Sequence, residues 1–386
     1  MTDQFNTRAL KISTDTSSEL YRNIEDSLKS LIEENINNQL RKQFYFEEVE
    51  TSIMLDLSDP CVSFYVTKFP EKYFRVIGHK QYVLRPAACA GALKRWQNLA
   101  PHLLSAHLPA IVHESALCHR LEQSGEVKGL ERAFAFRMPD YHMLLKKEQT
   151  IEAFKTVEGI LRNFYKKLGL ADEDFKTIVR FNTNSLEERS QYEESLNLKE
   201  NVLKDYTFET KPEKEKPYYN LKIEYAYKDL QIGTIQIDSF YPLAFELGQQ
   251  YNVIHFSPGS YTRLIDLLNK ANLVLPQGIK LVVLTDQPEE ELEKVKSVVD
   301  FNILVDNRPL KQALSVSSAL DKLLYPVVLI KGKKEAQNEY SFVDRTTNEK
   351  GLVSLDQLKN KFKKLPNGRK IHYYEFSYYK YCDIPL

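Results

Sequence analysis

The chain has 386 residues, with 53 Lys and Arg against 53 Asp and Glu, and 42% of its residues are hydrophobic. This length is sufficient for two domains with sizeable cores, and the zero formal net charge excludes a global field that would attract a polyanion. Four scattered cysteines are too few for a disulfide framework, and no apolar run has the length of a signal core or a membrane span, so we expect a cytoplasmic protein outside the membrane.

Helical and strand patterns alternate through the first half of the chain. Apolar residues recur at helical spacing after Ser17 or Ser18 as N-cap, and this helical pattern ends in a short strand at residues 46–51. A second helix follows the segment LRPAACAG. Residues 110–145 are typical of paired strands joined by the loop QSGEVKG, and residues 151–168 have the periodicity of an amphipathic helix.

The second half begins with a charged, proline-containing segment at residues 211–217, which predicts a solvated turn or insertion. NLKIEYAY and QIGTIQIDSF then alternate with period two, as half-buried antiparallel strands do, and a helix is predicted from Ser257 or Pro258. From VLPQGIK onward, the short apolar runs LVVLT, FNILVD and PVVLIKG alternate with helical stretches. We therefore predict two domains, residues 1–272 and residues 273–386.

The hairpin HRLEQSGEVKGLERAFAFRMPDYHM carries many hydrogen-bonding groups. Arg120 and Glu122 are two residues apart, which places both on one face of a strand, and Arg132, Phe136 and Asp140 follow at intervals of four on another shared face. A guanidinium, an aromatic ring and a carboxylate suit a nucleotide beside an amine. A surface hairpin with cross-strand ion pairs explains the same charges, and the hairpin taken alone favours this second interpretation.

A metal site is a separate hypothesis. Cys89 lies at a predicted helix start, His142 at a strand end, and His255 just before another helix. One Cys and two His are suitable zinc ligands, and three protein ligands leave a position open for a substrate. Their spacing is not diagnostic, however, and each residue taken alone is more often an ordinary core or surface residue.

The order of the segments RPAACAG, HRLEQSGEVKGLERAFAF, PDYHML, YYNLKIEY, GTIQID, VIH and GSYTRLIDLL resembles the class II aminoacyl-tRNA synthetases, and among them the threonyl enzymes. The resemblance covers nearly the whole chain. It implies an α+β fold in which an antiparallel sheet flanked by helices forms the catalytic domain. A small α/β domain similar to that family's anticodon-binding domain is expected to follow.

The resemblance also implies the ATP site. Arg120 matches the second-motif arginine that holds the α-phosphate, and Arg263 matches the third-motif arginine that holds the far phosphates. With Lys222, they are the expected catalytic residues. The expected ATP-binding residues are Arg120, Glu122, Arg132, Phe136 and Arg263, of which Phe136 takes the place of the aromatic that stacks on adenine. ATP is the expected substrate, and Mg²⁺ is expected to accompany it.

For the amino-acid pocket, the resemblance implies a zinc ion held by Cys89, His142 and His255. The expected amino-acid-binding residues are Met138, Asp140, Tyr219 and Gln236. Such a site accepts a substrate amine together with a β-hydroxyl, which disfavours valine, whereas serine loses only one methyl contact, worth about 1–3 kcal/mol.

The sequence departs from the family pattern at several positions. Ser52 replaces a proline of the first motif, and in the family this motif shapes the dimer interface. We still expect a homodimer. Phe134 replaces an arginine, Met138 replaces a glutamine, and His255 lies one residue closer to the GSYTRL helix than usual. We expect the N-terminal and editing domains to be absent, because residues 1–16 leave no room for them. QALSVSSALDKLL has a single basic residue, where the family pattern has several for phosphate contacts.

Three functional hypotheses remain open. We prefer an enzyme that activates threonine, or a close β-hydroxy or small amino acid, and passes it to an acceptor such as a carrier-protein thiol or a small molecule. The second hypothesis is a minimal threonyl-tRNA synthetase that charges tRNA-Thr. The third is a non-catalytic paralogue with a regulatory or assembly role.

Overall fold

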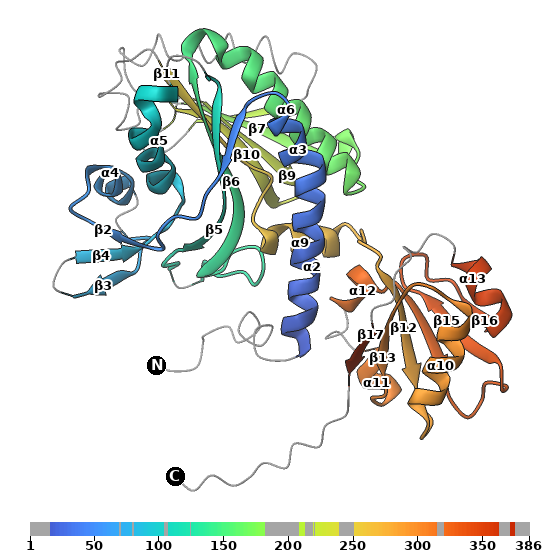
Figure 1. Cartoon of the computed structure of the whole chain (residues 1–386). Coiled ribbons are helices and arrows are strands. Elements are labelled where there is room, and N and C mark those ends of the chain that lie inside the picture. The colour runs from blue at the N-terminus through green and yellow to red at the C-terminus, as the bar shows by residue number, and fades with distance from the viewer. Residues whose placement is uncertain are drawn as a thin grey trace, which may run out of the picture. The chain divides into compact units, whose positions relative to one another are not determined.

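The computed structural model describes residues 16–68, 71–78, 81–103, 107–123, 125–181, 208–212, 219, 221–238, 251–314, 320–362 and 371–374. These residues fall into two compact units (Figure 1). The first unit lies within Leu28–Leu267, and the second lies within Leu268–Leu386 and includes the N-terminal helix up to Ser27. The domain boundary after residue 272 stays a prediction. No helix in the described ranges is both long and apolar enough to cross a membrane.

An eight-stranded sheet forms the centre of the first unit, in the order β1-β5-β6-β11-β10-β9-β7-β8. Its strands are β1 (Tyr45–Glu48), β5 (Ala110–His119), β6 (Ala135–Lys146), β7 (Phe175–Phe181), β8 (Phe208–Pro212), β9 (Leu221–Tyr227), β10 (Leu230–Asp238) and β11 (Tyr251–Ser257). The edge pairs β1–β5 and β7–β8 are parallel, and every pair between them is antiparallel. The predicted α+β class with an antiparallel sheet is confirmed.

Helices flank this sheet, and the first unit also contains a small sheet of three strands. The helices of this unit are the end of α2 (Thr16–Ile32) from Leu28 onward, which continues through a π-helical turn (Glu33–Asn37) into α3 (Asn38–Arg41), then α4 (Pro60–Lys68), α5 (Cys89–Leu103), α6 (Thr150–Lys167) and α9 (Tyr261–Lys270). The small sheet has the order β2-β4-β3, with β2 (Met54–Asp56), β3 (Arg75–Ile77) and β4 (Gln81–Leu84). The predicted amphipathic helices match α2 and α6, whereas α4 and the small sheet were not predicted.

Several predicted boundaries were wrong. Ser17 and Ser18, predicted as N-cap candidates, lie inside α2, and α5 begins at Cys89, within the segment LRPAACAG and not after it. The third-motif helix α9 begins at Tyr261, because Ser257 is the last residue of β11 and Gly259 has φ +117°, a left-handed conformation outside helical geometry. Strand β1 ends at Glu48, and Thr51 instead bonds the Glu114 side chain. Lys211 and Pro212, predicted in a solvated turn, end β8, an edge strand where proline is tolerated. The rest of KPEKEKP lies outside the described residues, as do residues 315–319 of QALSVSSALDKLL.

The second unit contains a six-stranded sheet in the order β16-β15-β14-β12-β13-β17. Its elements are β12 (Gly278–Val283), α10 (Pro288–Val298), β13 (Asn302–Asp306), α11 (Leu310–Ala313), α12 (Asp321–Leu324), β14 (Val327–Lys331), β15 (Glu339–Asp344), β16 (Lys350–Ser354), α13 (Leu358–Lys361) and β17 (Ile371–Tyr374). Strands β14, β12, β13 and β17 are parallel. The predicted apolar runs form β12, β13 and β14, in the order expected of an α/β unit.

A buried ion cluster crosses the centre of this second sheet. The Lys280 ammonium lies 2.9 Å from Asp306 Oδ2 and 2.6 Å from Asp321 Oδ2, and all three side chains have no exposed surface. Arg308 pairs with Asp306 at 2.7 Å, and Arg345 pairs with Asp321 at 2.5 Å. Buried carboxylates remain ionised only beside such cations, so Lys280 links strands β12 and β13 with helix α12 electrostatically.

Removal of this cation is expected to destabilise the second unit. Lys280→Met leaves Asp306 and Asp321 with one arginine partner each and removes their shared buried ammonium, which costs about 1–3 kcal/mol in the free energy of unfolding. Calorimetric or urea unfolding measures the change. Lys294→Met is the matched control, because Lys294 pairs with Glu290 and Glu291 along the surface of α10, and its effect should be much smaller. Equal losses for the two variants would contradict a structural role for the cluster.

Candidate functional site

A row of polar residues crosses four strands of the first sheet. Lys222 on β9 pairs with Gln236 on β10, Gln236 pairs with His255 on β11, and His255 pairs with His142 on β6. Residues directly opposite each other in a sheet project from the same face. The antiparallel register therefore gathers two imidazoles, an amide and an ammonium on one face. His142 is more than 100 residues from His255 in the chain, yet lies directly opposite it.

A cavity of about 620 Å³ opens over this face. The predicted site residues that line the cavity are Cys89, Arg120, Glu122, Arg132, Phe136, Met138, Asp140, Tyr219, Lys222, Gln236, His255 and Arg263. His142 is buried behind this lining, against the ring of His255. The structure thus brings the predicted ATP-binding, amino-acid-binding and metal-binding residues to one place.

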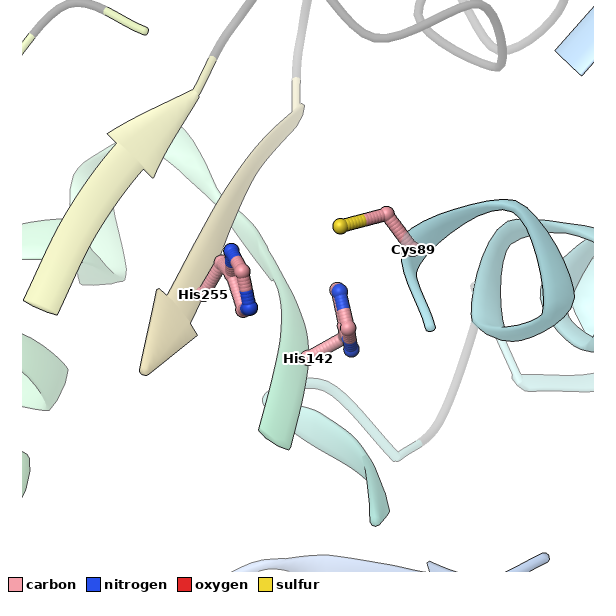
Figure 2. Close-up of side chains that lie close together, drawn as sticks. All are labelled: Cys89, His142 and His255. Carbon is pink, nitrogen blue, oxygen red and sulfur yellow. The ribbon is translucent and has the colours of Figure 1, made fainter. Parts of the chain in front are cut away.

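Cys89, His142 and His255 form a compact cluster at one end of the cavity. One ligand atom from each lies within 4.8 Å of the other two, and Figure 2 shows their side chains converging from helix α5 and strands β6 and β11. His142 Nε2 and His255 Nδ1 are buried without a hydrogen-bond partner in the described part of the chain. Orphaned imidazole nitrogens beside a thiol are the donor set that zinc accepts, so these residues fit the metal.

The protonation states in this cluster also suit a cation. Burial, with a smaller contribution from the neighbouring His255, lowers the pKa of His142 to about 3, so its imidazole is neutral as a metal ligand must be. Burial opposes ionisation of Asp140, yet the neighbouring His255, which also hydrogen-bonds its carboxyl, holds the pKa of Asp140 below the ordinary value. Asp140 therefore carries a negative charge in the cavity wall.

Asp140 connects the Cys and His cluster to the rest of the cavity. Its Oδ1 lies 2.5 Å from His255 Nε2, a contact that leaves Nδ1 as the lone-pair nitrogen of the ring. Its Oδ2 is buried and finds no hydrogen-bond partner among the described residues. This oxygen is available to accept hydrogen bonds from an ammonium group in the cavity.

Two guanidinium groups define the opposite end. Arg120 Nε donates to the Pro86 carbonyl at 3.1 Å, and Arg263 Nε donates to the Glu131 carbonyl at 3.0 Å. No carboxylate in the described ranges forms an ion pair with either group. Burial and the neighbouring charge of Arg120 lower the pKa of Arg263 to about 10. Neighbouring cations that form no ion pair with a carboxylate in the described ranges suit a polyanion such as a phosphate chain.

Phe136 and Met138 form the apolar part of the floor. Both are partly buried against a small cluster of Ala88, Ala116 and Cys118. The Arg120 guanidinium lies 4.9 Å from the centre of the Phe136 ring. A purine base can use this same aromatic surface, because both guanidinium groups and bases stack on phenyl rings.

Lys222 and Tyr219 border the cavity from β9 and the residues before it. The Lys222 ammonium lies 5.7 Å from the centre of the Tyr219 ring and 2.7 Å from Glu224 Oε1, while Arg180 pairs with the other oxygen of Glu224 at 2.9 Å. Lysine and arginine hold the pKa of Glu224 below its ordinary value against the opposing effect of burial. The Glu224 carboxylate, which also pairs with Arg180, therefore orients the Lys222 ammonium.

The structure corrects the predicted geometry of the hairpin. Arg120 and Glu122 lie beyond the end of β5 at His119, and Arg132 lies before the start of β6 at Ala135. Glu122 is buried and pairs with Arg132 at 2.8 Å and with Lys72 at 3.2 Å, so it positions cations rather than facing Arg120. Lys72 lines the cavity and was not predicted, because its segment FPEKYF contains no motif.

A second unpredicted group, the ion pair of Arg85 and Glu114, holds the site elements together. Arg85 Nη1 lies 2.7 Å from Glu114 Oε1, and both side chains are buried. Arg85 also donates to the Leu117 carbonyl and to Thr51 Oγ1, and Thr51 in turn donates to Glu114 Oε2. A neutral, fully bonded network of this kind fixes the chain before β2, the RPAACAG segment and strand β5 to one another.

Residues 74–270, just over half of the chain, match the family model of the tRNA synthetase class II core domain (G, H, P, S and T). The chain is 28% identical over 344 residues to the threonine–tRNA ligase of Methanosphaera stadtmanae, covering 80% of this chain and 55% of that protein. It is 33% identical over 235 residues to the threonine–tRNA ligase of Methanopyrus kandleri, covering 56% and 37%. The chain thus spans about half the length of the first relative and less of the second.

Solved structures show the same fold. The RNA binding domain of threonyl-tRNA synthetase from Cryptosporidium parvum Iowa II superposes with a TM-score of 0.66 at 23% identity, covering 91% of this chain and 92% of that chain. Putative threonyl-tRNA synthetase ThrRS-1 from Aeropyrum pernix superposes with a TM-score of 0.62 at 18% identity, covering 89% and 90%. The family model covers residues 74–270 and with them every residue of the cavity lining except Tyr65 and Lys72. The chain therefore belongs to the class II tRNA synthetases, and the relatives in sequence named above are threonine–tRNA ligases.

Proposed function

We propose that the chain uses ATP to activate threonine, or a close β-hydroxy or small amino acid, as an aminoacyl-adenylate with the assistance of zinc. The observation that carries the proposal is the single cavity with two chemically distinct ends. Paired guanidinium groups suit phosphates at one end, and the Cys and His cluster with Asp140 suits a small amino acid at the other. The space between them accommodates the reacting carboxylate and α-phosphate.

The phosphate end supports adenylate formation. The substrate carboxylate oxygen bonds to the α-phosphorus of ATP, the bond to the bridging oxygen breaks, and pyrophosphate leaves with the electron pair. Arg120 and Arg263 are anchored through their Nε atoms, so their remaining N–H groups can bond the phosphate oxygens as negative charge moves onto them. Mg²⁺ bound to ATP belongs to the same proposal.

The amino-acid end supports selection of a small polar substrate. Asp140 Oδ2 is suited to receive the ammonium group, and Gln236 and Tyr219 offer hydrogen bonds to the remaining polar atoms. Cys89, His142 and His255 would hold zinc, and the metal supplies open coordination positions for an amine and a β-hydroxyl. Met138 restricts the volume beside this pocket.

The acceptor has two candidate identities. The relatives in sequence are threonine–tRNA ligases, which supports tRNA-Thr. The alternative is a carrier-protein thiol or a small molecule, which the scarcity of basic residues in QALSVSSALDKLL supports. A homodimer is part of either proposal. A non-catalytic paralogue is the weaker hypothesis, because both guanidinium groups and the Cys and His cluster are retained in one cavity.

Amino-acid-dependent exchange of pyrophosphate with ATP tests the activation step. We expect exchange with threonine, weaker exchange with serine and none with valine. Arg120→Gln and Arg263→Gln should each lower kcat/KM at least 100-fold, because each removes a charge that stabilises the phosphates in the transition state. Arg75→Gln, which changes an exposed residue on β3, is the control. No exchange with any amino acid would show that the chain is a non-catalytic paralogue.

Zinc binding can be followed through the single tryptophan of the chain. Trp96 is buried on α5 with its ring centre 6.4 Å from that of His142. Titration of chelator-treated protein with zinc should change its fluorescence and saturate at one zinc per chain. His142→Ala should abolish the change, and His107→Ala, an exposed histidine outside the cluster, should preserve it. A stoichiometry far below one would count against the metal site.

Aminoacylation assays separate the two acceptors. Purified chain is incubated with threonine, ATP and transcribed tRNA-Thr, and a tRNA with an altered anticodon serves as the matched control. Charging that depends on the anticodon supports tRNA-Thr. If exchange is robust while neither tRNA is charged, the acceptor is of the carrier-protein or small-molecule kind.

A further inference from the structure

Glu122 presents an electrostatic problem at the phosphate end of the cavity. Its side chain is only 4% exposed, and one oxygen, Oε2, accepts from both Arg132 at 2.8 Å and Lys72 at 3.2 Å. A buried carboxylate without a cation is strongly destabilising, and beside a bound triphosphate it would also repel the ligand. At least one cation must therefore remain on Glu122 when ATP is bound.

Arg132 is poorly suited to be that cation. It lines the cavity, its side chain is 38% exposed, and it also reaches Glu126 Oε1 at 3.3 Å. An exposed guanidinium at the edge of a phosphate site is attracted to the incoming phosphates, because its planar fork bonds their oxygens in pairs. A move of Arg132 toward the ligand breaks its ion pair with Glu122.

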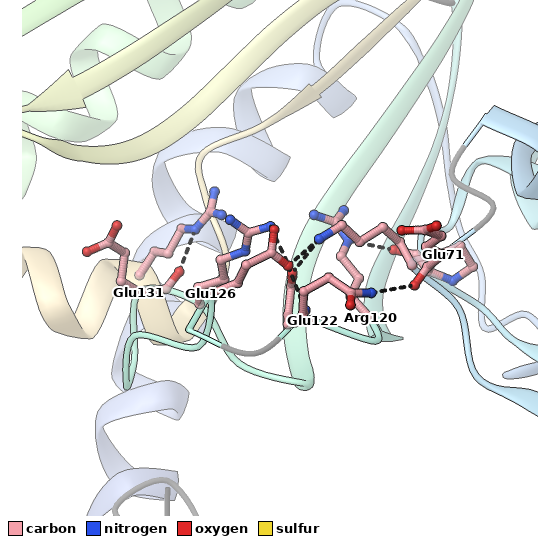
Figure 3. A network of polar contacts seen from close by, with 10 residues as sticks. Glu71, Arg120, Glu122, Glu126 and Glu131 are labelled. Carbon is pink, nitrogen blue, oxygen red and sulfur yellow. Dashed lines mark hydrogen bonds and ion pairs between the residues drawn. The ribbon is translucent and has the colours of Figure 1, made fainter. Parts of the chain in front are cut away.

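Lys72 is held in place independently of Arg132. Its carbonyl accepts a hydrogen bond from the Leu121 amide at 3.0 Å, and the neighbouring Glu71 carbonyl accepts one from the Gln123 side chain at 3.4 Å. Figure 3 shows this segment docked against the hairpin loop, with the ion pairs lying between them. The Lys72 ammonium also bonds Glu126, and this hydrogen bond, followed by one from the Gln123 amide, lowers the pKa of Glu126 to about 2.

The charge balance of the cluster depends on this lysine. Lys72 and Arg132 supply two positive charges, and Glu122 and Glu126 supply two negative charges, so the four side chains are neutral together. Without Lys72 the cluster has a net charge of −1 at the place where the phosphate site needs positive potential. We propose that Lys72 is a positioning residue for ATP, which neutralises Glu122 and thereby releases Arg132 to bind the phosphates.

This inference rests on the proposed function only in taking ATP as the ligand, and it predicts a specific pattern of affinities. Mg²⁺·ATP binding to the full chain is measured by isothermal titration calorimetry. Lys72→Met should weaken binding at least tenfold, whereas Lys72→Arg should stay within about threefold of the unchanged chain because it keeps the charge. Lys128→Met is the matched control, because Lys128 lies in the hairpin loop against which the Lys72 segment packs, but is 62% exposed and outside the cavity lining.

A double-mutant cycle separates positioning from direct phosphate contact. If Lys72 acts by neutralising Glu122, Lys72→Met should cost little affinity once Glu122→Gln has removed the carboxylate charge. The double variant Lys72→Met with Glu122→Gln should therefore bind Mg²⁺·ATP nearly as tightly as Glu122→Gln alone. If Lys72 contacts the phosphates directly, the double variant remains as weak as expected from the sum of the single losses, and the positioning role is wrong. Thermal unfolding checks each variant, and Lys72→Gln replaces Lys72→Met if the latter does not fold.

The remaining outcomes are also decisive. Unchanged affinity in Lys72→Met overturns the inference, and so does a failure of the unchanged chain to bind Mg²⁺·ATP at all. ATP binding with the expected cycle, but without amino-acid-dependent exchange, supports the role of Lys72 while it removes the proposed activation reaction. The two proposals therefore fail in distinguishable ways.

Discussion

The antiparallel pairing of β6 with β11 is the constraint on which the candidate site depends. It places His142 directly opposite His255, and the next pairing places His255 opposite Gln236. A shift of one residue in this register would turn one histidine to the far face of the sheet and separate it from Cys89. Because β6 and β11 are central strands with buried residues on both faces, such a shift would also expose core side chains. The stability of the sheet therefore maintains the geometry of the site.

The guanidinium groups of Arg120 and Arg263 are held in the cavity in the same way. Arg120 and Arg263 are each fixed through Nε to a backbone carbonyl, which restrains the side chain without consuming its charge. The charges of Arg85 and Glu114, in contrast, neutralise each other in a buried ion pair. This contrast distinguishes Arg120 and Arg263, which form no ion pair in the described ranges, from the Arg85 and Glu114 pair, whose charges balance each other within the fold.

Sequence periodicity predicted the main elements well and their ends poorly. The helix at residues 151–168 and the strands of the hairpin follow from local patterns, because burial of one face imposes a period of 3.6 or 2. The start of α9 depends on Gly259, whose backbone conformation no periodicity reveals. Phe134, predicted as a departure from the family pattern, packs edge-on against Phe74 at 6.2 Å, a contact between segments 60 residues apart.

The sequence by itself determined the family, the chemical types available to the site and the order in which they occur, because motif residues keep their spacing along the chain. Only the tertiary structure decided which of them meet. It brought Cys89 to His142 and His255, and it turned Asp140 toward His255. It also brought Lys72 to Glu122, since ion pairs between distant segments depend on how the strands and loops pack in three dimensions and leave no signal in local sequence.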